Sequence, residues 1–177
     1  MYFNLPNLIT LFRIFIIPFY IYELMADNYF LALAFFVIGS ISDFLDGFFA
    51  RKLNQITSLG KFLDPLADKL FFLFSLSIMS YKKLVPLWFF GILLLRDILV
   101  SIGSVIYIDK VGMKEIKPHL VGKLVNVCIF FITLFVLIDN TLLEINFYFF
   151  YYPLYYLATI FSIYSLYIYW LRFKKLG

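Results

Sequence analysis

Long apolar runs, bounded by charged or turn-forming residues, occupy most of this chain. A bilayer core about 30 Å thick needs about 20 apolar residues for each helical crossing. The pattern therefore predicts an all-α integral membrane protein with six transmembrane helices, in a single domain over residues 1–177. The predicted helices are Leu8–Tyr22, Tyr29–Ala50, Leu59–Tyr81, Val85–Ile108, Leu120–Ile138 and Phe147–Leu171.

Composition agrees with a membrane location. The chain is 64% hydrophobic and 15% charged, with a mean hydropathy of +0.95, which excludes a water-soluble globule. An aromatic content of 23% suits lipid-facing and interfacial surfaces. The single cysteine, Cys128, forms neither an internal disulfide nor a cysteine metal site, so we expect it to be a small buried hydrophobe.

Positive charge gathers at the edges of the apolar runs. The net charge is +4, but the basic residues are spread between apolar runs, which indicates a membrane collar and no nucleic-acid partner. The first and fifth connections carry acidic residues instead, so the positive-inside rule predicts that both termini lie on the cytoplasmic side of the cytoplasmic membrane. The residues of the collar are Arg51, Lys52, Lys61, Lys110, Lys114, Lys117, Lys123, Arg172, Lys174 and Lys175.

Acidic residues lie inside or at the cytoplasmic ends of the apolar helices. They are Asp43, Asp46, Asp64, Asp68 and Asp97. Each costs about 2.5–3.5 kcal/mol on insertion scales, so a functional role is the default hypothesis. Asp43 and Asp46 stand three residues apart and Asp64 and Asp68 four apart, so each pair shares a helical face. A hairpin of the two helices would turn the pairs toward each other near the cytoplasmic surface.

Four carboxylates in a poorly solvated pocket require either partial protonation or bound cations. Oxygen ligands without cysteine favour Mg²⁺, Mn²⁺ or Ca²⁺. The structural alternative for a single acid is a salt bridge to Lys69 or Arg51. An ion or proton carrier is the alternative of another class, because clustered membrane acids also mark ion pathways. A non-catalytic scaffold would leave the acids unexplained.

Small residues accompany the acids. Gly47, Ala50 and Gly60 would open a slot beside them for a planar group such as a nucleotide. Close helix packing is the alternative, because small residues also serve that purpose in membranes.

The acids and small residues together resemble the signature of the CDP-alcohol phosphatidyltransferase family, with every defining position present. The pattern is Asp43-x-x-Asp46-Gly47-x-x-Ala50-Arg51, then eight residues, then Gly60-x-x-x-Asp64-x-x-x-Asp68. The resemblance covers the whole chain and implies the family's fold of six transmembrane helices, usually as a homodimer.

The resemblance implies an enzyme that transfers a phosphatidyl group from CDP-diacylglycerol to an alcohol and releases CMP. Asp43, Asp46 and Asp64 would coordinate two divalent cations, Mg²⁺ or Mn²⁺, and Asp68, beside the metals, would be the general base. The residues expected at the CDP-lipid are Asn7, Gly47, Ala50, Arg51, Thr57 and Gly60.

The opening segment from Leu5 to Arg13 is similar to the family branch that uses glycerol 3-phosphate, in which the Pro6–Asn7 region lies near the nucleotide. The sequence is equally compatible with two structural roles: Asn7 as a helix cap, and Arg13 as a cytoplasmic anchor.

Two elements point to an acceptor site. Arg96-Asp97 and Gly122-Lys123 resemble elements of the same branch, and Arg96 and Lys123 would grip an acceptor phosphate. The structural alternative is that Arg96 pairs with an acid and Lys123 extends to the interface. The chain departs from the branch pattern in having Asn126 where a Thr is common, and Ser101 and Ser104 near the place of a second arginine.

The stretch Lys117–Asn126, with Arg96-Asp97, also resembles the cardiolipin synthases of this family, whose acceptor is phosphatidylglycerol. We expect glycerol 3-phosphate as the acceptor and phosphatidylglycerophosphate as the product, with phosphatidylglycerol as the alternative acceptor. The single histidine, His119, is interpreted as an interfacial loop residue, because Asp68 already fills the role of base.

Overall fold

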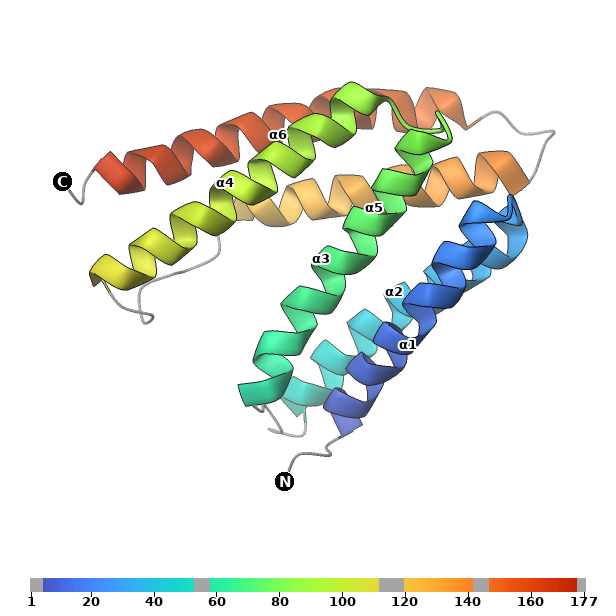
Figure 1. Ribbon diagram of the computed structural model, residues 1–177, viewed down its shortest axis with the longest axis horizontal. Coiled ribbons are helices and arrows are strands. Elements are labelled where there is room, and N and C mark those ends of the chain that lie inside the picture. Colours follow the sequence, from blue (N-terminus) through green and yellow to red (C-terminus); the bar gives the residue numbers. More distant parts are fainter. Residues whose placement is uncertain (1–4, 53–57, 112–119, 142–146, 175–177) are drawn as a thin grey trace. The chain divides into compact units, whose positions relative to one another are not determined.

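The computed structural model describes residues 5–52, 58–111, 120–141 and 147–174, with side chains for most of them. These residues contain helices and no strand, so the predicted all-α class is confirmed (Figure 1). The helices are α1 (Leu5–Met25), α2 (Tyr29–Lys52), α3 (Ser58–Tyr81), α4 (Leu87–Val111), α5 (Leu120–Thr141) and α6 (Tyr148–Lys174).

Most helices extend a few residues beyond the apolar runs that predicted them. Two helices start later than predicted: α6 begins at Tyr148, one residue after the predicted Phe147, and α4 begins at Leu87 and not at the predicted Val85. Pro86 accounts for the shift of α4, because the residue before a proline is disfavoured in a helix. The Pro86 carbonyl accepts hydrogen bonds from the backbone N–H groups of Phe89 and Phe90, which makes Pro86 the first acceptor of the helix.

Among the residues that the structure describes, three helical stretches are long and apolar enough to cross a membrane, namely Leu8–Met25, Leu120–Thr141 and Tyr148–Leu171. Within α2 and α3 the described apolar stretches are shorter, at Tyr29–Asp43 and Lys69–Tyr81. The chain is therefore a membrane protein by helix length and composition, and the number of six crossings stays a prediction.

The chain divides into two compact units. The first consists of Met1–Met79 and Leu137–Asn146, and the second of Ser80–Val136 and Phe147–Gly177. The first thus holds α1, α2 and nearly all of α3, and the second holds α4, most of α5 and α6.

An aromatic cluster forms the core of the first unit, where α1 lies alongside α2 (Figure 1). The rings of Phe36 and Phe71 stack with centroids 5.5 Å apart, and the Tyr20 ring lies 5.1 Å from Phe71. The buried hydroxyl groups of Tyr20 and Ser75 form a 2.5 Å hydrogen bond. Because these residues come from three helices, the cluster ties α1, α2 and α3 together.

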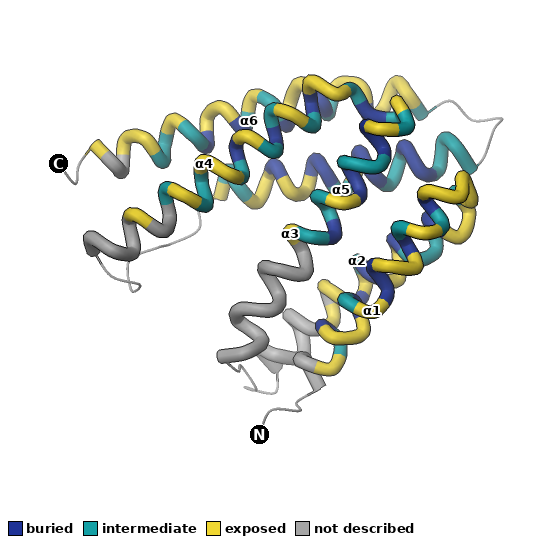
Figure 2. Tube along the Cα trace, viewed as in Figure 1, coloured by how far each residue is buried: buried dark blue, intermediate teal, exposed yellow. Residues whose placement is uncertain are grey.

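The second unit is organised by α4 and α6, which lie side by side (Figure 1). Phe89 packs edge-on against Tyr155, with ring centroids 4.8 Å apart, and both are buried. One side of each helix is buried and the other is exposed, as Figure 2 shows. Cys128 of α5 is buried, as its sequence context predicted.

Gly39 provides a test of the first unit's packing. A Cβ atom at Gly39 would lie 3.3 Å from the Phe71 ring, which the stacked Phe36 and the adjacent Tyr20 hold in place. We expect Gly39→Ala to destabilise the protein by about 1–3 kcal/mol, the usual cost of overpacking.

Gly91 of α4 is the matched control, since a Cβ there meets no described atom within 4 Å. We expect Gly91→Ala to leave the stability unchanged or slightly higher. Unfolding of both variants in detergent micelles would measure the difference, and equal stabilities would contradict a tight Gly39–Phe71 contact.

Candidate functional site

The four signature acids lie on two consecutive helices, Asp43 and Asp46 in α2 and Asp64 and Asp68 in α3. Both segments are helical, so the spacings of three and four residues put each pair of positions on one helical face. The structure describes the side chain of Asp43. Those of Asp46, Asp64, Asp68, Asn7, Gly47, Ala50, Arg51 and Gly60, and all of Thr57, lie outside the described part of the chain.

The packing of α2 against α3 gives the register of the two acidic pairs. Gly39 faces Phe71, and the two helices run in opposite directions (Figure 1). Asp46 lies seven residues after Gly39, and Asp64 lies seven residues before Phe71. At a rise of 1.5 Å per residue, both positions lie about 10 Å from this contact, toward the same end of the hairpin.

Asp43 forms an ion pair with Arg13 of α1. The distance from Arg13 Nη1 to Asp43 Oδ1 is 3.0 Å, and the side chain of Arg13 is 1% exposed while that of Asp43 is 50% exposed. The interpretation of Arg13 as an anchor at the membrane edge is therefore wrong, because an anchor would extend to the interface. The cap interpretation of Asn7 is also wrong, since α1 begins earlier, at Leu5, and Asn7 lies inside its first turn.

This ion pair is a contact that the sequence analysis missed, since it named Lys69 and Arg51 as candidate partners of the acids. Arg13 was the sequence feature that could have indicated this ion pair, because a basic residue inside an apolar helix requires an anionic partner. Among the residues whose side chains are described, no three of the types His, Cys, Asp and Glu meet. Asp43 nevertheless suits a hard divalent cation, since its half-exposed carboxylate supplies oxygen donors.

A second polar site lies within the other unit, around Arg96 of α4. Its Nη1 lies 2.6 Å from Asp97 Oδ1, and its Nη2 donates a long hydrogen bond of 3.5 Å to the hydroxyl of Ser165 in α6. A Cβ at Gly122, in the first turn of α5, would lie 3.1 Å from the same Nη2. Three helices thus meet at one guanidinium group.

The structure confirms that Arg96 pairs with an acid, the structural alternative in the sequence analysis. Pairing does not use all of its donors: Nε of Arg96 is buried and has no hydrogen-bond partner among the described residues. The predicted partner Lys123 follows Gly122 directly and is exposed. The sequence analysis missed Ser165, for which the only signal was a polar side chain on an aromatic helix.

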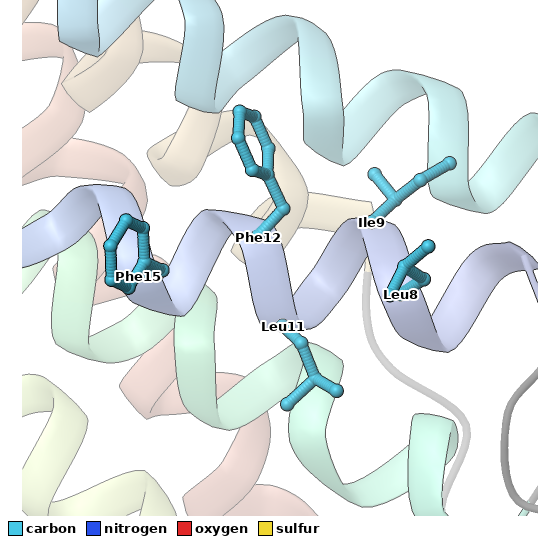
Figure 3. A pocket seen from close by; sticks show the side chains of 5 residues that line it. All are labelled: Leu8, Ile9, Leu11, Phe12 and Phe15. Atoms are coloured by element: carbon cyan, nitrogen blue, oxygen red, sulfur yellow. The ribbon is translucent and has the colours of Figure 1, made fainter.

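An open apolar groove of about 540 Å³ lies along the first half of α1 (Figure 3). Its described lining consists of Leu8, Ile9, Leu11, Phe12 and Phe15. These side chains carry no polar atom, so the groove suits contact with lipid and contains no group for chemistry.

Comparison with known proteins agrees with the motifs. The sequence profile of the CDP-alcohol phosphatidyltransferase family matches residues 3–170. The CDP-diacylglycerol–glycerol-3-phosphate 3-phosphatidyltransferase of Aquifex aeolicus is 45% identical over 136 residues, which cover 75% of this chain and 71% of that protein. The protein of the same name from Bacillus subtilis is 36% identical over 133 residues, which cover 62% of this chain and 69% of that protein.

A cardiolipin synthase (CMP-forming) of Streptomyces coelicolor is also similar, at 34% identity over 110 residues that cover 56% of this chain and 50% of that protein. The family profile extends from the residues before α1 into the last turns of α6 and includes both polar sites. The chain belongs to the CDP-alcohol phosphatidyltransferase family.

Proposed function

We propose that this chain transfers the phosphatidyl group of CDP-diacylglycerol to glycerol 3-phosphate, releasing CMP and forming phosphatidylglycerophosphate. Relatives at 45% and 36% identity carry the name of this activity. The higher identity to these relatives than to the cardiolipin synthase carries the choice of acceptor. The buried Arg96, whose Nε has no partner among the described residues and whose Nη2 lies against the Gly122-Lys123 element, supplies a group for an anionic phosphate on the acceptor.

The acidic positions of α2 and α3 form the donor site in this proposal. Asp43, Asp46 and Asp64, with Asp68 beside them, would hold two divalent cations, Mg²⁺ or Mn²⁺. The cations, when bound, neutralise charge on the diphosphate and on the departing CMP. The helical register supports a shared site, because it puts positions 46 and 64 at one level of the hairpin.

Asp68 acts as the general base in this proposal. The acceptor hydroxyl oxygen forms a bond to the lipid phosphorus, the bond from that phosphorus to CMP breaks, and the hydroxyl proton moves to the Asp68 carboxylate. The CDP part of the donor lies against Asn7, Gly47, Ala50, Arg51, Thr57 and Gly60. The small residues of this set leave room for the nucleotide, and Arg51 offers a forked contact to phosphate.

Arg96 and Lys123 hold the acceptor phosphate. Asp97 and Ser165 occupy Nη1 and Nη2 of Arg96, which fixes the plane of the guanidinium group. A fixed guanidinium binds a phosphate more selectively than a free ammonium group, because its donors are arranged in a planar fork. Lys123 adds a second positive charge from the exposed side of α5.

We further propose a single domain in the cytoplasmic membrane, with the active site at the cytoplasmic face, both termini cytoplasmic, and a homodimeric assembly within the lipid bilayer. The charge pattern supports the orientation, because Lys and Arg concentrate at the second and fourth connections and at the C-terminus.

The second candidate is a cardiolipin synthase that uses phosphatidylglycerol as acceptor. The similarity to the Streptomyces coelicolor protein favours it, as does the stretch Lys117–Asn126. Phosphatidylglycerol also carries an anionic phosphate, so Arg96 is compatible with either acceptor.

The reaction is tested by CMP release from purified protein in detergent, with CDP-diacylglycerol, Mg²⁺ or Mn²⁺, and one acceptor at a time. We expect release with glycerol 3-phosphate and not with inositol phosphate or serine. Release with phosphatidylglycerol alone would identify a cardiolipin synthase. Silence with every acceptor and both metals would contradict the enzyme and favour an ion carrier.

Asp68→Asn tests the base. The amide cannot take the hydroxyl proton, so we expect turnover to be abolished while metal-dependent binding of CMP is partly retained. Asp27→Asn is the matched control, because Asp27 lies in the connection between α1 and α2 with a φ of 62°, a conformation that Asn also adopts. Unchanged turnover in Asp68→Asn would refute the assignment.

Arg96→Ala tests the acceptor grip. Loss of a charge-assisted contact of about 1.5–3 kcal/mol predicts a 10- to 100-fold higher KM for glycerol 3-phosphate, with the KM for CDP-diacylglycerol unchanged. We expect a smaller increase for Gly122→Ala, whose Cβ would push on Nη2, and none for Gly91→Ala. An acceptor KM that stays unchanged in Arg96→Ala would return Arg96 to a structural role.

A further inference from the structure

We propose that Arg13 of α1 is a positioning residue for the donor site: it holds the carboxylate of Asp43 in place for a divalent cation and does not touch substrate. This inference rests on the proposed function, since it assumes that Asp43 is a metal ligand.

The side chain of Arg13 is more deeply buried than that of Arg96, which supports an indirect role at the site. The Arg13 side chain is 1% exposed, whereas its neighbours on the other side of α1, Phe12 and Phe15, are 51% and 65% exposed and line the apolar groove (Figure 3). Arg13 therefore lies on the inner face of α1. It acts on the site through the groups that it contacts, and Asp43 is one of them.

Structural need alone does not account for an arginine at this position. A cationic side chain in a membrane helix costs about 2.5–3.5 kcal/mol on insertion scales, and an apolar residue of similar size would pack without that cost. Two buried polar residues also lie close in sequence to the members of the ion pair. Thr10, one turn earlier in α1, and Ser42, next to Asp43 in α2, are buried as well.

The geometry suits a carboxylate that must hold a cation in a defined place. Arg13 Nη1 donates to one oxygen of Asp43, Oδ1, at 3.0 Å. A carboxylate has two oxygens and about four lone-pair sites, so this contact leaves capacity for a metal ion. Groups that bond to a metal ligand orient it, and their loss typically lowers metal affinity or activity by about 10- to 100-fold.

The ion pair also joins two helices that the site needs together. Arg13 belongs to α1, which carries the Pro6–Asn7 segment, and Asp43 belongs to α2, which carries Asp46, Gly47 and Arg51. With the side chain of Asp43 attached to α1, the acidic face of α2 is held in one rotation about its axis.

The test is direct binding of Mn²⁺ to the purified full-length protein in detergent, measured from the electron paramagnetic resonance signal of free Mn²⁺. We expect the Kd for Mn²⁺ to rise about 10- to 100-fold in Arg13→Met, with a smaller rise in Arg13→Lys. Lysine keeps the charge but lacks the planar fork. Arg96→Met is the matched control: it removes a buried, carboxylate-paired arginine of the second unit, and we expect it to leave the Kd for Mn²⁺ unchanged.

The Asp43→Asn background separates an effect through Asp43 from a general one. If Arg13 acts by positioning Asp43, Arg13→Met adds no further loss of Mn²⁺ affinity to Asp43→Asn. A further loss of about tenfold would overturn the inference. If Arg13→Met does not yield a monodisperse protein, the same comparison is made with Arg13→Lys.

The Mn²⁺ measurement distinguishes a wrong positioning role for Arg13 from a wrong metal site in the proposed function. A wild-type protein that binds Mn²⁺, with the same Kd in Arg13→Met and Arg13→Lys, overturns the positioning role alone. A wild-type protein that binds no Mn²⁺ overturns the metal site of the proposed function and the positioning role with it.

Discussion

The cost of placing a charge in apolar surroundings governs both polar sites of this protein. Both arginines whose side chains the structure describes are buried and have a carboxylate partner, Arg13 with Asp43 and Arg96 with Asp97. Such a charge is tolerated in a membrane helix when it faces other helices and is paired. The Arg13–Asp43 pair joins one face of α1 to α2. The contacts of Arg96 with Ser165 and at Gly122 mark the face of α4 that turns toward α6 and α5.

A glycine allows a close contact between helices in each of the two units. At Gly39 the missing side chain leaves room for the Phe71 ring, and at Gly122 it leaves room for the Arg96 guanidinium. The first contact stabilises the aromatic core of the helical hairpin that carries the acidic positions. The second lets the guanidinium lie against the backbone of α5, where its plane is also fixed by Asp97 and Ser165. Small residues at helix interfaces are common in membranes because they let helices approach, and here Gly122 also shapes the polar site around Arg96.

The two sites differ in charge in the way that the proposed reaction requires. The acidic positions of α2 and α3 suit cations and, through them, the diphosphate of the donor, while Arg96 and Lys123 suit an anionic acceptor. The proposed reaction is a direct displacement and needs no covalent enzyme intermediate. In the proposed reaction the residues of this chain bind charge, orient two anions and remove one proton.

The sequence by itself determined the helical class, the approximate helix bounds, the family and the acidic motif, because apolar runs and i, i+3 or i+4 spacings are local properties of the chain. It also singled out Arg96, Gly122 and Lys123 as candidates for an acceptor site, since each lies in a short motif. The tertiary structure alone decided the partners: Arg13 with Asp43 across two helices, and Arg96 with Ser165 across 69 residues. Local periodicity tells which side of a helix is polar, but which distant residue meets that side follows from how the helices pack.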